Sequence, residues 1–227
     1  MTKLCIIGSG SSIGIGVMEA IKKHNDVRVI KVGRSINHDV NLNLSFDNFS
    51  LDLFNIPLDC DKYIITLGVL YSKKINDQSS VEVLNSMVVN LLFPVKIIEQ
   101  ILDVNPNANI VVIGSESGSK GSFDTSYFLA KSALSKYVRE KRVIYSEQQL
   151  VMISPSVIID TKMTQDRGDL ENVLSKCKKL SKKRCLYVQE VVELIMYILF
   201  IDKGYVNNEV INMNGGKFAR MFYDKDN

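Results

Sequence analysis

The segment Ser9-Gly10-Ser11-Ser12-Ile13-Gly14-Ile15-Gly16 stands between an apolar run at residues 4–7 and a helix-patterned segment at residues 17–22. Glycines permit a tight turn, and they let backbone N–H groups approach a pyrophosphate that the following helix N-terminus stabilises. The strand-loop-helix context that such a loop needs is present. The sequence therefore predicts a dinucleotide-binding loop rather than a merely structural turn, formed by Gly8, Ser9, Gly10, Ser11, Ser12, Ile13 and Gly14.

Outward from this loop, short β-branched runs alternate with longer helix-patterned segments. Buried strands are predicted at residues 4–7, 27–32, 63–67, 110–113, 150–153 and 210–213. This alternation predicts an α/β protein with a doubly wound parallel sheet and helices on both faces, a three-layer Rossmann fold. No repeat or Pro/Gly-rich linker interrupts the 227 residues, so we expect a single domain.

Two segments depart from this alternation. Residues 34–63 are too few for two further β-α steps, so we expect a short strand near Val40 and one helix over about residues 46–54. Residues 161–187 form a polar, Lys-rich segment that is longer than an ordinary connection. We expect this segment to be a substrate lid at the carboxyl edge of the sheet.

Composition and charge give no reason to expect nucleic acid, a membrane or a metal as a partner. The net charge is only +3, and the basic lid lacks the interleaved aromatic residues of a nucleic-acid-binding face. We expect no apolar stretch of the roughly 18 to 20 residues that a membrane span needs, and hence a soluble cytoplasmic protein. Cys5, Cys60, Cys177 and Cys185 include no C-x-x-C pair and are expected to be reduced thiols.

The end of the second predicted strand bears on the choice of cofactor. A site selective for NAD presents an Asp or Glu to the ribose 2′-hydroxyl, whereas this chain has Gly33-Arg34-Ser35. A guanidinium beside a hydroxyl suits a 2′-phosphate, and Asp39 lies too far along the chain to supply the missing carboxylate. Arg34 and Ser35 therefore predict NADP(H) in preference to NAD(H); the alternative is that Arg34 is a solvated surface residue.

Tyr127 and Lys131 lie four residues apart, on one face of a helix-patterned segment. Tyrosine normally titrates near pH 10, so acid–base work at neutral pH requires a nearby cation that favours the phenolate. On its own this spacing is common on helix surfaces. Ser115 gives it more weight, because it ends the strand at residues 110–113, at the edge of the sheet where α/β proteins bind ligands.

In their order and approximate spacing, these motifs resemble the short-chain dehydrogenase/reductase family, from the glycine loop to Asn214-Gly215-Gly216. The resemblance implies that Tyr127 donates a proton to the substrate oxygen during hydride transfer from nicotinamide, while Ser115 holds that oxygen. It implies that Lys131 binds the nicotinamide ribose and lowers the pKa of Tyr127, and that Asn90 places a proton-relay water. Further cofactor contacts are implied for Leu67, Gly68, Asn90, Tyr127, Lys131, Pro155, Val157 and Thr161.

The chain departs from the family pattern at several positions. Thr66 stands where the family has an asparagine, Ser156 where it usually has a glycine, and Thr161 one residue later than usual. Pro94, four residues after Asn90, lacks the N–H that would bond the Asn90 carbonyl. We hypothesise that this carbonyl accepts a hydrogen bond from the relay water; the alternative is an ordinary helix kink.

Residues 81–102 and 128–138 are apolar beyond a single helical face, which is typical of helices buried on both sides. In the family the equivalent helices pack against symmetry mates, so the resemblance implies a homodimer or homotetramer. The alternative is that the lid or the C-terminal tail covers them.

The expected activity is the reversible, NADP(H)-dependent reduction of a carbonyl on a small molecule to an alcohol. The basic lid would attract an anionic substrate, such as a nucleotide-linked keto sugar or a 3-oxoacyl thioester, unless its lysines only form a solvated face. The competing hypothesis is an NADP(H)-binding redox sensor or scaffold without turnover. The joint presence of Asn90, Ser115, Tyr127 and Lys131 favours the enzyme.

Overall fold

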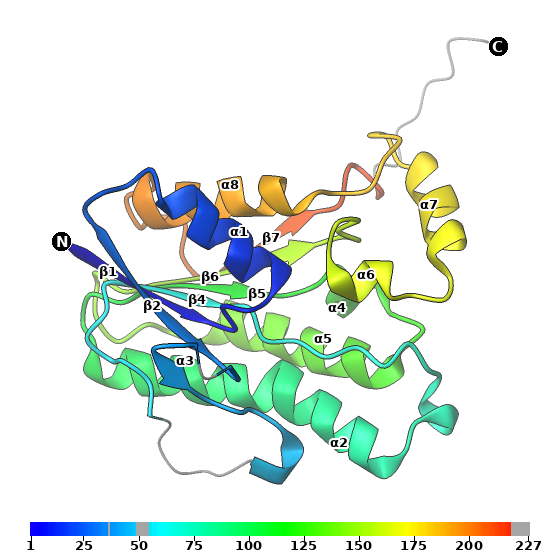
Figure 1. Cartoon of the computed structure of the whole chain (residues 1–227), viewed down its shortest axis with the longest axis horizontal. Coiled ribbons are helices and arrows are strands. Elements are labelled where there is room, and N and C mark those ends of the chain that lie inside the picture. Colours follow the sequence, from blue (N-terminus) through cyan, green and yellow to red (C-terminus); the bar gives the residue numbers. More distant parts are fainter. Residues whose placement is uncertain (36, 49–54, 219–227) are drawn as a thin grey trace.

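A computed structural model of the chain describes residues 1–35, 37–48 and 55–218 (Figure 1). Its strands form one sheet in the order β3-β2-β1-β4-β5-β6-β7, and every neighbouring pair is parallel. This confirms the doubly wound fold, in which the strand order reverses beside β1. The strands are β1 Thr2–Ile7, β2 Val27–Gly33, β3 Val40–Asn41, β4 Lys62–Ile65, β5 Asn109–Ile113, β6 Gln149–Pro155 and β7 Glu209–Met213.

Helices cover both faces of the sheet (Figure 1). One face carries α1 Ser12–Ile21 and α8 Val188–Phe200, and the other carries α2 Ser80–Met87, α3 Phe93–Val104 and α5 Thr125–Glu140. Successive side chains of a strand point to opposite faces. Leu4 and Ile6 of β1 accordingly join the core beneath α1 and α8, while Cys5 and Ile7 join the core beneath α3 and α5. Both faces are covered, which explains why the strands are apolar runs rather than alternating patterns.

The bounds of most elements differ from the predictions by one or more residues. Helix α1 begins at Ser12, inside the glycine loop, because Ser11 caps it by accepting a hydrogen bond from the Gly14 N–H. Strand β4 ends at Ile65, two residues before the predicted end. The short strand near Val40 is β3, as predicted. Of the helix expected over residues 46–54, the described part is a 3₁₀ turn, Phe46–Asn48, and residues 49–54 lie outside the described residues.

Short helices lie at the carboxyl edge of the sheet and in its connections. A 3₁₀ turn, Ile75–Asp77, precedes α2, and helix α4 spans Ser117–Lys120. The segment predicted as a lid contains α6, Lys162–Gln165, and α7, Leu170–Lys178, at the right of Figure 1. A parallel bridge between Ile158 and Leu186 joins the two ends of this segment. The lid segment therefore contains two short helices, although its composition is polar.

The prediction of four reduced thiols is wrong for one pair. Cys177, near the end of α7, and Cys185 form a disulfide with their Cα atoms 5.1 Å apart. The chain turns back after α7, and the two cysteines pack with Val173, Val157 and Ile159 in a small apolar cluster. Cys5 and Cys60 are buried free thiols, as expected. The eight-residue separation did not indicate this pairing, which depends on the turn after α7.

The expectation of no span-length apolar stretch is also wrong. Among the described residues, one continuous helical segment, Ser80–Val104, is long and apolar enough to cross a membrane by length and composition alone. It comprises α2, a π-helical turn at Val88–Leu92 and α3, and 44% of its most apolar window is buried inside the fold. Core helices pass the same test. Ile97, Ile98 and Ile101 of this segment pack into the core beneath the sheet, so the segment serves as a core helix here.

Candidate active site

A cavity of about 990 Å³ opens at the carboxyl ends of β1, β2, β4, β5 and β6. Ligands of doubly wound sheets bind at this edge, near the point where the strand order reverses. Most of the predicted site residues line it: Gly8, Gly10, Ser11, Ser12, Ile13, Arg34, Ser35, Leu67, Gly68, Ser115, Tyr127, Lys131, Pro155, Val157 and Thr161. Ser9, Gly14 and Asn90 were predicted to bind the cofactor but do not line the cavity.

Two residues of the glycine loop determine its conformation without lining the cavity. Gly8 has a φ of +87°, which favours glycine. Ser9 is fully buried, and its hydroxyl donates to the Val32 carbonyl at 3.3 Å. A Cβ on Gly14 would lie 2.8 Å from the Ser9 carbonyl oxygen and 3.0 Å from that of Gly8. Ser9 and Gly14 therefore fix the shape of the loop, while Gly10 and Ser11 present it to the cavity.

Thr66 supplies the support that the family obtains from an asparagine. Its hydroxyl donates toward the Gly8 carbonyl at 2.8 Å and accepts a hydrogen bond from the Ser11 hydroxyl at 2.9 Å. Its backbone N–H donates to the Ile7 carbonyl at 2.9 Å, continuing the pairing of β4 with β1. The residue after β4 thus holds the glycine loop in place, although its side chain is a hydroxyl rather than an amide.

Tyr127 and Lys131 reach the cavity from the first turns of α5. Asp124 caps this helix by accepting a hydrogen bond from the Tyr127 N–H at 3.0 Å. Lys131 is 2% exposed, and its ammonium donates to the carbonyls of Leu67 and Ile113, both at 3.1 Å. It lies 5.9 Å from the centre of the Tyr127 ring. Ser115, just after β5, forms a side-chain hydrogen bond with Tyr127.

The protonation of this group differs from the prediction. Burial raises the pKa of Tyr127, and the negative charge of Asp124 raises it further. The hydrogen bond with Ser115 acts in the opposite direction but does not outweigh burial. Burial lowers the pKa of Lys131 from 10.5 to about 8. The expected depression of the Tyr127 pKa by Lys131 is therefore wrong for this arrangement, because burial dominates and the ammonium is directed to two backbone carbonyls.

The buried ammonium has a measurable consequence for stability. Because the pKa of Lys131 falls from 10.5 to about 8 on folding, the unfolded chain binds more protons between these pH values, and stability rises with pH there. Compared with a Lys131→Met variant, the wild type is expected to gain up to about 3 kcal/mol in the free energy of unfolding between pH 7 and pH 10.5. Urea unfolding of both proteins across this range measures the gain, and a difference that does not change with pH would contradict it.

Asn90 supports the site from within the helical layer. It is fully buried; its amide oxygen accepts from the Val69 N–H at 3.1 Å, and its amide nitrogen donates to the Val69 carbonyl at 2.9 Å. In the π-helical turn around it, the Phe93 N–H donates to the Val88 carbonyl, five residues back. This irregularity lies where Pro94 removes a helical N–H. The relay-water hypothesis for the Asn90 carbonyl stays a prediction.

Asp124 is a supporting residue that the sequence analysis missed. Besides the Tyr127 N–H, its carboxylate accepts from the Tyr71 N–H at 2.9 Å, from Gln78 at 2.7 Å and from Ser126 at 2.9 Å. Burial alone would raise its pKa, but these hydrogen bonds outweigh burial and lower it. Asp124 thus joins the loop after β4 to the start of α5. The signal was an Asp immediately before a helix, a common N-cap.

The lid segment closes against the glycine loop. The Lys162 N–H donates to the Ser12 hydroxyl at 3.4 Å, and Met163 also lines the cavity. Thr161 lines the cavity too, but its hydroxyl bonds the Ile158 carbonyl and the Thr164 hydroxyl, both at 3.1 Å. The predicted nicotinamide contact of Thr161 therefore competes with these local hydrogen bonds.

Among the described residues at the end of β2, no carboxylate faces the cavity. Asp39 accepts a hydrogen bond from the Lys31 N–H at 2.7 Å and does not line the cavity. Arg34 does line it, and none of the described residues forms an ion pair or hydrogen bond with its guanidinium. The imidazole of His38, which the sequence analysis did not single out, lines the cavity beside Arg34 and Ser35.

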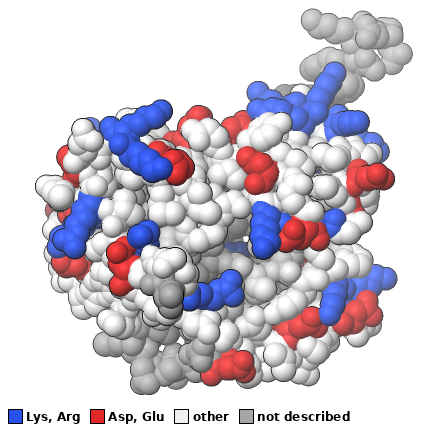
Figure 2. All heavy atoms as spheres, in the orientation of Figure 1, with Lys and Arg blue, Asp and Glu red and all other residues white. Residues whose placement is uncertain are grey.

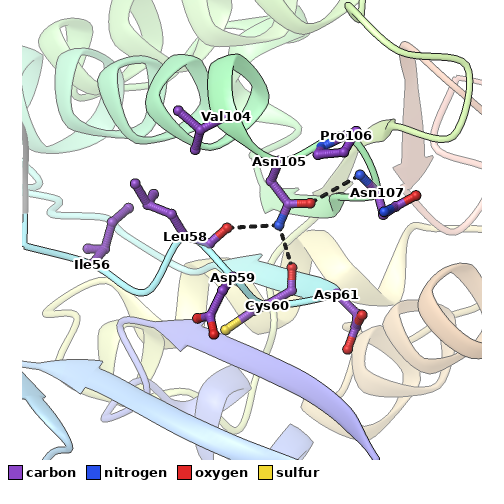
Figure 3. A pocket seen from close by; sticks show the side chains of 9 residues that line it. All are labelled: Ile56, Leu58, Asp59, Cys60, Asp61, Val104, Asn105, Pro106 and Asn107. Carbon is purple, nitrogen blue, oxygen red and sulfur yellow. Dashed lines mark hydrogen bonds between the residues drawn. The ribbon is translucent and has the colours of Figure 1, made fainter.

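A second cavity, of about 660 Å³, lies at the opposite edge of the sheet (Figure 3). It lies where the chain enters β4 and β5. The Asn105 amide donates to the carbonyls of Leu58 and Cys60 at 2.9 and 2.8 Å and so connects the segments that lead into these two strands. Its amide is thus engaged in structural hydrogen bonds. Ligands of this fold bind at the carboxyl edge, so we assign this cavity no part in the site.

Within the described residues no group of three His, Cys, Asp or Glu is placed to hold a metal.

Comparisons with known proteins agree with this geometry. No protein-family model matches the chain. It is 24% identical to a 3-oxoacyl-[acyl-carrier-protein] reductase, FabG, of Buchnera aphidicola, over 94% of this chain and 96% of that protein. Its fold is similar to that of 4-hydroxyisoleucine dehydrogenase complexed with NADH, with a TM-score of 0.80, 18% identity and coverage of 96% and 99% of the two chains.

Two further solved structures share the fold. An oxidoreductase of the short-chain dehydrogenase/reductase family from Burkholderia thailandensis superimposes with a TM-score of 0.78 and 16% identity, over 96% of this chain and 93% of that chain. A variant of ElxO with NADPH bound gives a TM-score of 0.75 and 15% identity, over 95% and 98%. The fold, the full-length similarity to a reductase and the meeting of Ser115, Tyr127 and Lys131 at one cavity all agree with the resemblance to the short-chain dehydrogenase/reductase family.

Proposed function

We propose that this oxidoreductase uses NADP(H) to reduce a carbonyl group to an alcohol, reversibly. The observation that carries the proposal is that Ser115, Tyr127 and Lys131 line the same cavity as the glycine loop. A proton donor, a hydrogen-bonding hydroxyl and a cation thus lie beside a loop suited to a dinucleotide. The redox sensor or scaffold without turnover would not need this combination.

The residues around the cavity fit a nicotinamide dinucleotide. Gly8 and Gly10 allow close approach of the backbone, and the N-terminus of α1 presents N–H groups to a pyrophosphate. Similar structures whose names state a bound NADH or NADPH support a nicotinamide cofactor. Remaining contacts are assigned to Leu67, Gly68, Pro155, Val157 and Thr161, which also line the cavity.

When bound, a nicotinamide cofactor would supply a hydride to the substrate carbon. Tyr127 is placed to donate its phenolic proton to the substrate oxygen, so that the carbonyl would become an alcohol and Tyr127 a phenolate. Ser115, which already bonds Tyr127, holds the same oxygen and orients it. The Lys131 ammonium binds ribose hydroxyls and returns a proton toward Tyr127, while Asn90 keeps the loop after β4 in place and orders the relay water.

Arg34 and Ser35 favour NADP(H) over NAD(H) in this proposal. In an Arg34→Asp variant we expect NADPH affinity to fall by about 10- to 100-fold, because a charge-assisted contact is replaced by repulsion of the 2′-phosphate. NADH affinity is expected to stay constant or rise. Fluorescence titration with both dinucleotides measures the change, with Arg28→Asp, at the other end of β2, as the matched control. Equal losses for NADPH and NADH would count against the assignment.

An anionic substrate, either a 3-oxoacyl thioester or a nucleotide-linked keto sugar, is the class we favour. The curated relative acts, by its name, on 3-oxoacyl groups of a carrier protein. Basic residues gather over α7 and the segment after it, at the upper right of Figure 2. Arg167 and Arg184 are paired with Asp169 and Glu190, but within the described residues no ion pair engages Lys162, Lys176, Lys178, Lys179, Lys182 or Lys183.

The proposal is tested by offering the purified protein a panel of 3-oxoacyl thioesters, keto sugar nucleotides and simple ketones with NADPH. Consumption of NADPH with one member, with stoichiometric alcohol formed, supports the reductase. Tight NADPH binding without turnover on any class would favour the sensor or scaffold.

Assembly and location are part of the proposal. Val81, Leu84, Leu92 and Leu129 are large apolar residues exposed on the helical layer of α2, α3 and α5. We propose that this surface packs against a second copy in a homodimer or homotetramer, because burial of apolar area is the usual basis of such contacts. A cytoplasmic location and the absence of nucleic-acid and membrane partners stay predictions.

A further inference from the structure

Glu116 is an acidic residue in the wall of the cavity, immediately after Ser115 in the chain. Both residues line the cavity of about 990 Å³. Consecutive Cα atoms are about 3.8 Å apart, so the two residues belong to the same part of its wall. The Glu116 N–H donates to the Pro155 carbonyl at 2.9 Å, and the Glu116 carbonyl accepts from the Ser119 N–H at 3.0 Å. Backbone hydrogen bonds therefore hold Glu116 beside the serine that is proposed to bind the substrate oxygen.

The carboxylate of Glu116 is buried and has one charged partner. The residue is 7% exposed, and its Oε1 lies 3.0 Å from the Lys217 ammonium, which comes from the segment after β7. Within the described residues, no hydrogen bond engages either carboxylate oxygen. A carboxylate accepts up to about four hydrogen bonds, and its burial without donors is costly. Most of the accepting capacity of Glu116 is therefore left for a ligand.

The ion pair with Lys217 balances the charge of Glu116 from outside the cavity. Lys217 does not line the cavity, and its side chain is 47% exposed. The neighbouring Phe218 ring lies 4.0 Å from the ammonium of Lys120, so this segment packs on the end of α4. Because one cation already compensates the carboxylate, a ligand does not need to bring a second one. Neutral donors such as hydroxyl groups suit the remaining lone pairs.

This part of the wall separates the two favoured substrate classes. Ser117 and Ser122 line the cavity as well, so hydroxyls accompany the carboxylate of Glu116. In a nucleotide-linked keto sugar, the carbonyl is flanked by carbons that carry hydroxyl groups. In a 3-oxoacyl thioester it is flanked by the thioester and an alkyl chain, which would desolvate the carboxylate without donating to it. The keto sugar is therefore the class that satisfies Glu116.

We propose that Glu116 is a specificity-determining residue that accepts hydrogen bonds from hydroxyl groups beside the reacting carbonyl. The substrate is accordingly a polyhydroxylated ketone, as in a nucleotide-linked keto sugar, and not a 3-oxoacyl thioester. The inference rests on the proposed function and narrows its substrate class. The diphosphate of such a substrate would meet the basic lid, while its uncharged sugar ring would meet the carboxylate.

Steady-state kinetics with NADPH test the inference, with a nucleoside diphosphate-linked keto sugar and acetoacetyl-coenzyme A as the two probes. We expect the wild type to have the higher kcat/KM for the keto sugar. In Glu116→Leu this value should fall by about 10- to 100-fold, mainly through KM, as for lost hydrogen bonds to a charged group. The value for acetoacetyl-coenzyme A should rise, because an apolar wall replaces a charge. Glu116→Gln keeps one acceptor oxygen and should lose less.

Lys217→Met is the matched control for a purely structural role. It breaks the same ion pair but leaves the carboxylate in the wall of the cavity. We expect a lower melting temperature, with the preference for the keto sugar within about threefold of wild type. If Lys217→Met and Glu116→Leu changed this preference equally, Glu116 would only hold the segment after β7, and the inference would be wrong.

The outcomes separate this inference from the proposed function. A wild type that prefers acetoacetyl-coenzyme A, or a Glu116→Leu protein with unchanged preference, overturns the inference and leaves the reductase in place. If Glu116→Leu does not fold, the preference of Glu116→Gln decides in the same way. A wild type that binds NADPH but reduces neither probe would instead overturn the proposed function.

Discussion

Replacing Tyr127 with phenylalanine is expected to lower kcat by about 10²- to 10⁴-fold, the range for loss of a general acid, while the NADPH Kd stays within about twofold. The hydroxyl is the group that donates the proton, and its hydrogen-bond partner is Ser115, another residue of the site. Tyr127 is 8% exposed and lines the cavity, so phenylalanine preserves the packing of the ring. Steady-state rates and a fluorescence titration of the same preparation give both quantities.

The matched control is Tyr137→Phe in the same helix. The Tyr137 hydroxyl bonds the Glu99 carboxylate at 2.8 Å, and this residue does not line the cavity. This variant loses a partly buried hydrogen bond and should be less stable by about 1 kcal/mol, yet it should retain wild-type kcat. If Tyr127→Phe also retained wild-type kcat, the proton donor would have to be another group, and the assignment of Tyr127 would be wrong.

Much of the fold follows from local pattern. Six β-branched runs separated by helical segments predicted a parallel sheet, and all six are strands in the structure. The pattern works because parallel strands buried on both faces must be apolar throughout. It works less well at boundaries. Helix α1 begins at Ser12 because of a side-chain cap within the glycine loop, and β4 ends two residues early because Leu67 instead offers its carbonyl to Lys131.

The candidate site was predictable where its members share one helix or follow a strand. Tyr127 and Lys131 are one helical turn apart, and Ser115 lies two residues after the end of β5. What was missed depends on contacts between distant segments. Thr66 meets the Ser11 hydroxyl across 55 positions, and Cys177 meets Cys185 only because the chain turns back after α7. The raised pKa of Tyr127 also depends on burial, which residue spacing does not reveal.

Replacing Gly14 with alanine is expected to weaken NADPH binding by about 10- to 100-fold. The new Cβ would lie 2.8 Å from the Ser9 carbonyl oxygen and 2.9 Å from the Ser9 Cα, and these backbone atoms cannot rotate away as a side chain would. Overpacking of this kind costs about 1–3 kcal/mol. The loop relieves it by moving off α1, which misdirects the N–H groups that bind the pyrophosphate, and each 1.4 kcal/mol is a tenfold change in Kd.

Gly16→Ala separates this effect from a general loss of stability. It lies two residues further along the same helix, where a Cβ would be 2.9 Å from the Val192 side chain and 3.0 Å from that of Val188. The crowding is similar, but it falls on α8 rather than on the glycine loop. We expect a lower melting temperature in both variants, with the NADPH Kd of Gly16→Ala within about threefold of wild type. Because the two glycines crowd different neighbours, a Gly14→Ala protein with wild-type affinity would show that this loop does not bind the pyrophosphate.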